Sequence, residues 1–226
     1  MATATDSGAR TGSAGTLRVT EIFHSIQGES SRVGLPTVFV RLTGCPLRCA
    51  WCDTAYAFSG GETRSIDEVL QRVAAFDCTT VCVTGGEPLA QKGCLALLDA
   101  LCDAGYSVSL ETSGALDIGG VDPRVARIMD LKAPASGEHG KNRWENLELL
   151  TDRDELKFVL ASCEDYDWAV SACRQRRLFE LCPVLFSPVQ GQLDPAQLAQ
   201  WILDDRLPLR FQLQLHKVLW GSAQGR

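Results

Sequence analysis

The sequence lacks an excess of positive charge, a long apolar run and an export signal. It has 22 Lys and Arg against 28 Asp and Glu, a net charge of -6, whereas proteins that bind nucleic acid usually carry a basic face. No apolar stretch approaches the roughly 20 residues that cross a bilayer, and residues 1–8 lack the apolar core of an export signal. The sequence therefore predicts a cytoplasmic protein that acts on small molecules.

The composition is that of a folded protein. Hydrophobic residues make up 45% of the 226 residues, and a chain of this length can bury roughly 70% of the surface that its unfolded form exposes. No internal repeat or low-complexity segment competes with a globular domain. We expect a disordered tail over residues 1–16 and a single domain over residues 17–226.

Three of the ten cysteines, Cys45, Cys49 and Cys52, lie within eight residues. Three thiolates on one short loop can hold three irons of a [4Fe-4S] cluster and leave the fourth iron open to a ligand. Zinc would need a fourth ligand at finger-like spacing, which His24 and His139 do not provide, so it would require a remote ligand. We interpret the other cysteines as small buried hydrophobes and not as disulfides; they are Cys78, Cys82, Cys94, Cys102, Cys163, Cys173 and Cys182.

Short β-branched runs alternate with amphipathic stretches along the chain, which indicates repeated βα units and a mostly parallel sheet. Ser65 and Glu68 form a capping box, Pro88 fits the first turn of a helix, and Asp194 caps a later helix. Six units are too few for a closed eight-stranded barrel, so we predict an α/β fold with a partial (β/α)6 barrel. The expected strands are 37–43, 79–84, 107–111, 126–131, 155–160 and 182–186, with a seventh extended segment over 211–216.

Polar residues gather where the predicted strands end. In parallel βα folds the loops after the strands form one rim, where ligands bind. The first strand leads into the cysteine loop, and the later ones lead into segments 85–88, 111–114, 130–132 and 187–191. Each segment alone could be an ordinary turn, but their common placement predicts a binding site.

The cysteine spacing, followed one βα unit later by Gly85, Gly86 and Glu87, resembles the radical S-adenosylmethionine (SAM) superfamily. More closely, residues 17–220 resemble the 7-carboxy-7-deazaguanine synthase family of queuosine (7-deazapurine) biosynthesis. The resemblance rests on segments 21–29, 36–41, 49–54, 84–88, 111–114 and 215–217. It implies a carbon-nitrogen lyase that converts 6-carboxy-5,6,7,8-tetrahydropterin to 7-carboxy-7-deazaguanine with loss of ammonia.

The resemblance also implies the cofactors and partners. SAM would bind the open iron of the [4Fe-4S] cluster, and one electron would cleave it to methionine and a 5'-deoxyadenosyl radical, which takes hydrogen from the pterin. The cofactor carries the difficult chemistry, and the protein positions and shields it. A flavodoxin-like electron donor and a homodimer are implied, as is a magnesium ion on Thr54, whose hydroxyl could otherwise simply cap the next turn.

The remaining site residues follow from the same resemblance and from the predicted rim. Arg41 would face a substrate carboxylate, because an arginine inside an apolar strand is costly unless paired; an internal salt bridge to Glu29 or Glu111 is the alternative. The other predicted substrate contacts are Ile26, Gln27, Gly28, Thr112 and His216. The predicted SAM contacts are Trp51, Cys52, Asp53, Gly85, Gly86, Glu87, Gly114, Asp130, Leu131, Lys132, Ser187 and Gln190.

Two other functions remain open from the sequence alone. An activase that makes a glycyl radical on a partner protein has the same cysteine spacing, but it would leave Arg41 and Gln27 without a purpose. A zinc-stabilised binding module without catalysis is the other alternative. Both predict that the site is not a pterin pocket.

Overall fold

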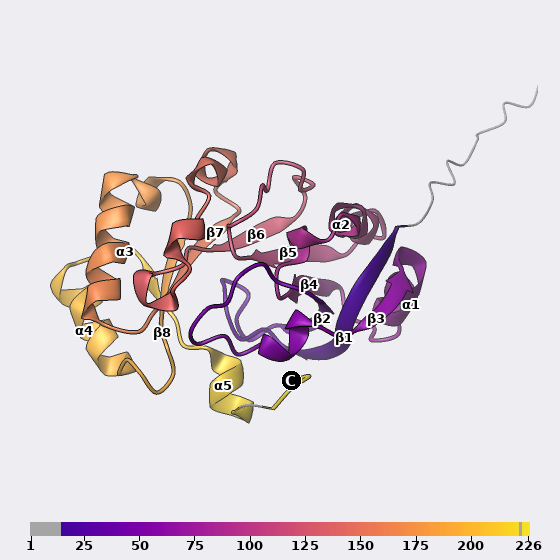
Figure 1. Ribbon diagram of the computed structural model, residues 1–226, viewed down its shortest axis with the longest axis horizontal. Coiled ribbons are helices and arrows are strands. Elements are labelled where there is room, and N and C mark those ends of the chain that lie inside the picture. The colour runs from indigo at the N-terminus through magenta and orange to yellow at the C-terminus, as the bar shows by residue number, and fades with distance from the viewer. Residues whose placement is uncertain (1–14, 222) are drawn as a thin grey trace, which may run out of the picture.

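The computed structural model describes residues 15–221 and 223–226, and most of the predicted tail, residues 1–14, lies outside them. The last residue of that predicted tail, Thr16, begins a strand and pairs with Ser65. The sheet has nine strands in the described part of the chain, in the order β3-β1-β2-β4-β5-β6-β7-β8-β9 (Figure 1). They are β1 (Thr16–Ile26), β2 (Pro36–Leu42), β3 (Glu62–Ser65), β4 (Thr80–Gly85), β5 (Ser107–Thr112), β6 (Ala126–Asp130), β7 (Glu155–Leu160), β8 (Val184–Pro188) and β9 (Arg210–Phe211).

The predicted fold class is confirmed. Strands β2 and β4 to β8 pair in parallel in the predicted order, and the sheet ends at β3 and β9 without closing. The six predicted strands agree with the observed bounds to within two residues. Strand β1, which the sequence analysis did not predict, pairs antiparallel with β2 and β3 and extends the sheet on one side.

Five α-helices occur in residues 15–221 and 223–226, namely α1 (Ile66–Ala74), α2 (Gly93–Asp103), α3 (Cys163–Gln175), α4 (Pro195–Asp204) and α5 (Leu215–Trp220). The capping box of Ser65 and Glu68 begins α1, and Asp194 accepts a hydrogen bond from the backbone N–H of Ala196 at the start of α4. Pro88 begins a separate 3-10 turn, Pro88–Ala90, and α2 starts at Gly93.

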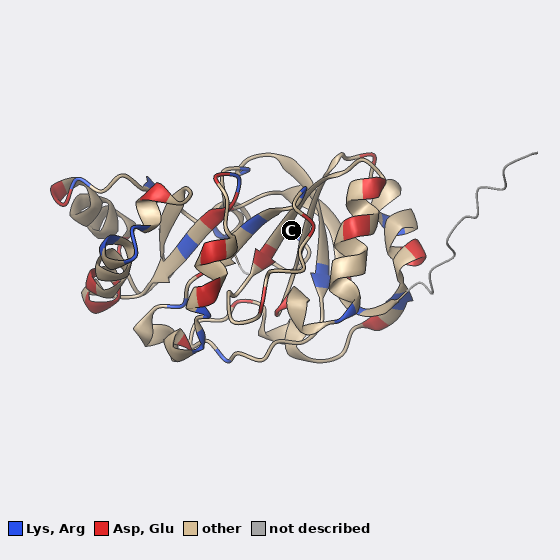
Figure 2. Ribbon diagram, turned by 90° about the horizontal axis from the view of Figure 1, so that it is seen from above, with Lys and Arg blue, Asp and Glu red and all other residues tan. Residues whose placement is uncertain are grey.

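The connections are less regular than six equal βα units. Between β5 and β6 the described chain has no α-helix, and between β6 and β7 it has only 3-10 turns. The helices α1 and α2 lie beside one half of the sheet and α3 and α4 beside the other (Figure 1). Acidic and basic residues are interspersed in the view of Figure 2, with acidic residues on the helices.

The predicted extended segment 211–216 is wrong beyond Phe211. The β9 strand stops there, and α5 begins at Leu215. The side chain of Gln212 accepts a hydrogen bond from the backbone N–H of Ser30 (2.6 Å) and donates one to its carbonyl (2.8 Å), and the N–H of Leu215 bonds Gly28 (3.0 Å). Contacts with the loop after β1 thus replace a strand ladder and direct the chain across the open side of the barrel.

The core contains four of the seven cysteines that were predicted to be buried. Cys82, Cys94, Cys173 and Cys182 are buried, Cys78 and Cys102 are half-buried, and Cys163 is exposed on α3. No helix in the described residues is long and apolar enough to span a membrane.

Candidate active site

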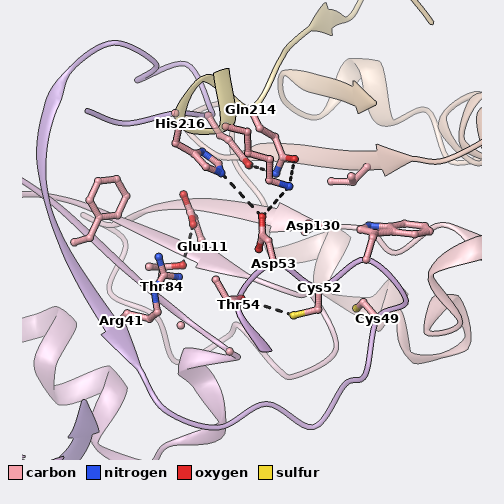
Figure 3. A pocket seen from close by; sticks show the side chains of 18 of the residues that line it. Arg41, Cys49, Cys52, Asp53, Thr54, Thr84, Glu111, Asp130, Gln214 and His216 are labelled. Carbon is pink, nitrogen blue, oxygen red and sulfur yellow. Dashed lines mark hydrogen bonds and ion pairs between the residues drawn. The ribbon is translucent and has the colours of Figure 1, made fainter. Parts of the chain in front are cut away.

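A cavity of about 510 Å³ lies at the carboxyl ends of the parallel strands, where the sequence predicted a binding rim. The cysteine loop after β2 forms one wall, and the ends of β4 to β7 form the floor. At the start of α5, Gln214 and His216 lie on the side opposite the cysteine loop (Figure 3), and residues 223–226 also line the cavity. Segments that are far apart in the sequence therefore enclose one space.

Most of the predicted site residues line this cavity. The predicted cluster ligands, the predicted magnesium ligand and all the predicted substrate contacts do so: Cys45, Cys49, Cys52, Thr54, Ile26, Gln27, Gly28, Arg41, Thr112 and His216. Eight predicted SAM contacts also line it: Trp51, Cys52, Asp53, Gly85, Gly86, Asp130, Lys132 and Gln190. Four predicted SAM contacts lie outside the lining: Glu87, Gly114, Leu131 and Ser187.

The three thiols of the cysteine loop are half-buried and share the cavity wall. Burial raises the pKa of Cys45 and of Cys49, and the nearby charge of Lys132 opposes this shift. In the described part of the chain no three His, Cys, Asp or Glu side chains are placed to hold a single metal ion. Three thiols that face the same cavity without surrounding a single ion fit a cluster of several irons. Each thiol would bind one iron as a thiolate.

Backbone contacts hold the cysteine loop from both ends. The N–H of Gly44 donates to the carbonyl of Ala57 (2.7 Å), and the N–H of Ala50 donates to that of Ser136 (3.0 Å). The N–H of Arg48 donates to the carboxylate of Glu138 (2.5 Å). These contacts within the chain therefore position the loop.

Gly85 and Gly86 are required by the packing of the strand ends. A Cβ on Gly85 would lie 2.3 Å from the carbonyl oxygen of Leu42, and one on Gly86 would lie 2.3 Å from that of Gly44 and 2.7 Å from the Cβ of Cys45. A side chain at Gly85 would therefore push away the end of β2, and one at Gly86 would push away the start of the cysteine loop. The glycine pair thus brings the end of β4 against the loop while its own backbone lines the cavity.

The four predicted SAM contacts outside the lining have other surroundings. Gly114 has a φ of 69° and forms the turn after β5, and Leu131 is fully buried in the core. The Oγ of Ser187 is buried and has no hydrogen-bond partner in the described residues. The carboxylate of Glu87 is fully buried and bonded to the chain itself.

Arg41 pairs with a carboxylate that the sequence analysis did not consider. Its Nε lies 2.7 Å from Oε1 of Glu21 on β1, and the hydroxyl of Tyr56 donates to the same oxygen at 2.7 Å. Burial raises the pKa of Tyr56 to about 12; the charge of Arg41 opposes this shift and the Glu21 carboxylate adds to it. Neither proposed internal partner, Glu29 or Glu111, forms this salt bridge, although the carboxylate of Glu111 lies in the same cavity.

A buried network of charges crosses the floor of the cavity. The Nζ of Lys157 on β7 forms salt bridges with Glu29 and with Asp130 (3.5 Å), and Lys132 pairs with the same Oδ2 of Asp130 (3.0 Å). The other oxygen of Asp130, Oδ1, is buried without a hydrogen-bond partner in the described residues.

The C-terminal segment joins this network to the cysteine loop. Lys217 lies 3.0 Å from Oδ2 of Asp53 and donates to Gln214 (2.6 Å), while Gln214 donates to Glu29 (2.6 Å). The Nε2 of His216 lies 4.0 Å from the same oxygen of Asp53. Figure 3 shows His216 and Gln214 above Asp53, facing into the cavity.

The network predicts that the contribution of Glu29 to the stability of the protein depends on pH. Burial opposes the charge of Glu29, but Lys157 and His216 outweigh it and lower the pKa of Glu29 below its ordinary 4.5. A depressed folded pKa stabilises the protein above the unfolded value, and this contribution is lost as the pH falls through the folded pKa. Glu29→Gln is therefore expected to cost about 2 kcal/mol near neutral pH.

Urea unfolding of the wild type and of Glu29→Gln between about pH 7 and pH 3 measures this cost. The difference between their free energies of unfolding should stay constant down to the ordinary pKa of 4.5 and shrink below it. Glu180→Gln, which removes an exposed ion pair with Arg177, is the control and should change stability little at either pH. A Glu29→Gln deficit that is constant over the whole range would contradict the prediction.

Comparison with known proteins identifies the class and then the family. A sequence model described as the Radical SAM superfamily matches residues 39–134, which hold the cysteine loop and the glycine pair. The 7-carboxy-7-deazaguanine synthase of Chlorobaculum tepidum is 51% identical over 92% of this chain and 97% of its own. That of Koribacter versatilis is 43% identical over 90% and 97%.

A solved structure gives the same fold. The crystal structure of QueE from Escherichia coli matches with a TM-score of 0.73 at 23% identity, over 89% of this chain and 95% of that one. The protein described here is thus a radical SAM protein, built on the superfamily's open barrel and cysteine loop. Within that class, the chain belongs to the 7-carboxy-7-deazaguanine synthase family.

Proposed function

We propose that this protein converts 6-carboxy-5,6,7,8-tetrahydropterin to 7-carboxy-7-deazaguanine with loss of ammonia, as a step of queuosine biosynthesis. The observation that carries the proposal is the single cavity that holds the three cysteines at one wall and Arg41 with the 26–28 segment at another. A cofactor at the cysteines and a bicyclic, carboxylated substrate would then share one space. The names of the curated relatives support the same reaction.

In this proposal Cys45, Cys49 and Cys52 bind a [4Fe-4S] cluster, and SAM binds beside it. The bound cluster and SAM supply a one-electron cleavage that yields an organic radical able to take hydrogen from the substrate. The backbone of Gly85 and Gly86, which lines the cavity, offers hydrogen bonds to SAM. The predicted contacts Trp51, Asp53, Asp130, Lys132 and Gln190, which line the cavity, enclose it.

The substrate occupies the side of the cavity formed by β1, β2 and α5. Arg41 uses Nε for Glu21, and no described residue accepts a hydrogen bond from its two terminal nitrogens, which suit a bidentate contact with a carboxylate. Ile26, Gln27, Gly28, Thr112 and His216 complete the predicted contacts. Because Thr112 already donates to Glu87, we expect its contribution to the substrate to come from its methyl group.

Thr54 is proposed as a ligand of Mg²⁺. It precedes the 3-10 turn Ala55–Phe58, but its side chain makes no cap hydrogen bond, so the alternative that it caps this turn gains no support. Its Oγ1 lies in the cavity, 3.8 Å from the Sγ of Cys52. Magnesium keeps several waters and needs only one or two protein oxygens when a substrate supplies others.

Thr54→Ala is expected to reduce the stimulation of turnover by added Mg²⁺ by about tenfold or more, because the ion loses its protein ligand. Turnover against Mg²⁺ concentration measures this effect. Thr54→Ser, which keeps the hydroxyl, is the matched control and should respond as the wild type does. Full stimulation of Thr54→Ala would show that the threonine has no role in binding the ion.

The decisive assay incubates the anaerobic, reconstituted protein with SAM, a reductant and carboxytetrahydropterin. Formation of 7-carboxy-7-deazaguanine supports the proposal, whereas SAM cleavage without this product would favour the glycyl-radical activase. Neither the activase nor a zinc-stabilised binding module is favoured by the relatives found. A flavodoxin-like electron donor, a homodimer and a cytoplasmic location stay predictions from the family resemblance and the sequence.

A further inference from the structure

The carboxylate of Glu87 is the most completely bonded acid at the site, although it does not line the cavity. Glu87 is 0% exposed. Its Oε1 accepts from the N–H of Leu89 (3.0 Å) and from Thr112 Oγ1 (2.9 Å), and its Oε2 accepts from the N–H of Ser113 (2.6 Å) and from Ser113 Oγ (2.5 Å). Four donors of the chain itself occupy its oxygens.

The backbone N–H groups of Glu87 and of its neighbour Gly86 bond to the end of β2 and the start of the cysteine loop. The N–H of Glu87 donates to the carbonyl of Gly44 (2.8 Å), next to Cys45, and the N–H of Gly86 donates to that of Leu42 (3.2 Å). One residue thus connects the start of the cysteine loop, the glycine pair after β4 and the turn after β5. Of these, Cys45, Gly86 and Ser113 line the cavity.

We propose that Glu87 is a positioning residue and not a direct ligand of SAM: its buried carboxylate fixes the Ser113 turn against the glycine pair and the cysteine loop. This inference rests on the proposed SAM site but not on the proposed pterin reaction. Because a carboxylate that accepts four hydrogen bonds has little capacity left for a ligand, Glu87 influences SAM through the backbone that it holds. The positions of those groups determine how well they meet a bound molecule.

The test begins with Glu87→Gln in the protein without cluster or SAM. The new amide places an N–H group where Oε1 or Oε2 now accepts, so at least one donor at Thr112, Ser113 or Leu89 loses its acceptor. Hydrogen exchange should become about tenfold faster at the amide of Ser113 or of Leu89, whichever faces the new N–H group, and stay unchanged in α1. Unchanged exchange at both amides would overturn the proposal.

The second measurement is the dissociation constant of SAM for the reconstituted proteins, determined by equilibrium dialysis. Glu87→Gln is expected to weaken SAM binding about tenfold and Ser113→Ala by less, since the latter keeps the backbone N–H bond. If Glu87 acts through the Ser113 turn, the double variant should bind SAM no more weakly than Glu87→Gln alone. Additive losses would indicate a direct contact of Glu87 with SAM and contradict the proposal.

Asp154→Asn is the matched control for general destabilisation. Asp154 is also a buried acid that accepts backbone hydrogen bonds, from Arg127 (2.8 Å) and Thr151 (2.7 Å), but it precedes β7 at the end away from the cavity. Asp154→Asn should lower the melting temperature and leave SAM affinity unchanged. Loss of SAM affinity in this control as well would show that the effect of Glu87 is only structural. Thr112→Val supplies a milder variant if Glu87→Gln does not fold.

Discussion

Cys49→Ala is expected to remove SAM cleavage while leaving the chain folded. The Cys49 thiol is half-buried on the cavity wall and makes no disulfide, so alanine deletes a proposed cluster ligand without opening the core. Loss of a group that only supports a metal ligand typically lowers metal affinity or activity about 10- to 100-fold. Loss of the ligand itself should therefore reduce SAM cleavage by more than about 100-fold. The melting temperature of the apoprotein should change by less than about 4 °C, because little packing is lost.

Two measurements separate this outcome from misfolding. After anaerobic reconstitution, visible absorbance and acid-labile sulfide report the cluster, and circular dichroism reports the fold. Cys163→Ala is the matched control, because Cys163 is exposed on α3, outside the cavity lining, and it should keep both cluster and cleavage. A brown Cys49→Ala protein with wild-type cleavage would contradict the assignment of the cysteine loop.

The parts of the fold that were predictable are those encoded within a few residues. A buried β-branched run predicted each parallel strand, and the capping box at Ser65 predicted the start of α1. Because parallel strands all end at one edge, the positions of the polar residues after them also predicted the rim of the cavity. The cysteine spacing lay within one loop and needed no tertiary information.

The missed partners of the site depend on contacts between distant segments. Glu21 meets Arg41 because β1 pairs antiparallel with β2 in a register that places these two residues opposite each other. The sequence analysis treated residues 21–29 as a motif and not as part of a strand, so this pairing could not be found. The sequence analysis inferred that Arg41, an arginine in an apolar strand, needs a partner, and the neighbouring antiparallel strand β1 supplies it.

The wrong strand at 211–216 has a related cause. Alternation of Gln and Leu over six residues fits a strand, but it also fits a segment whose glutamines bond to a neighbouring loop. The backbone N–H of Gln212 still donates to Phe186 of β8 (2.9 Å), but the side chains of Gln212 and Gln214 bond to Ser30 and Glu29, and no strand continues beyond this point. Short alternating runs do not distinguish these cases without knowledge of the neighbouring loop.

Lys157 was also missed, although its sequence context resembled that of Arg41. It is a lysine in the middle of the fully buried strand β7, which is costly without partners. The structure supplies two, Glu29 and Asp130. Burial opposes its charge, but the two carboxylates outweigh this and raise the pKa of Lys157. Lys157 is therefore a cation that, together with Lys132, balances the charges of Glu29 and Asp130 on the cavity floor.

Lys157→Met is expected to give the largest loss of stability of any single change at the site. Methionine fills a similar volume, but Glu29 and Asp130 keep their negative charges in a buried place, and removal of one partner from a buried ion pair costs about 3 kcal/mol or more. For a protein of this size the melting temperature should fall by about 6 to 12 °C. Lys141→Met, at an exposed lysine, is the control and should change stability by less than about 0.5 kcal/mol.

The pH dependence and a double variant identify the cause of that loss. Without Lys157 the two carboxylates take up protons more readily, so the deficit of Lys157→Met should shrink as the pH falls from about 7 toward 4. Adding Glu29→Gln should restore part of the lost stability, because it removes the charge that has lost its salt bridge, whereas Asp130 keeps Lys132. If the deficit does not depend on pH and the double variant is no more stable than the single one, the loss comes from packing. The charge network would then not be what supports the floor of the cavity.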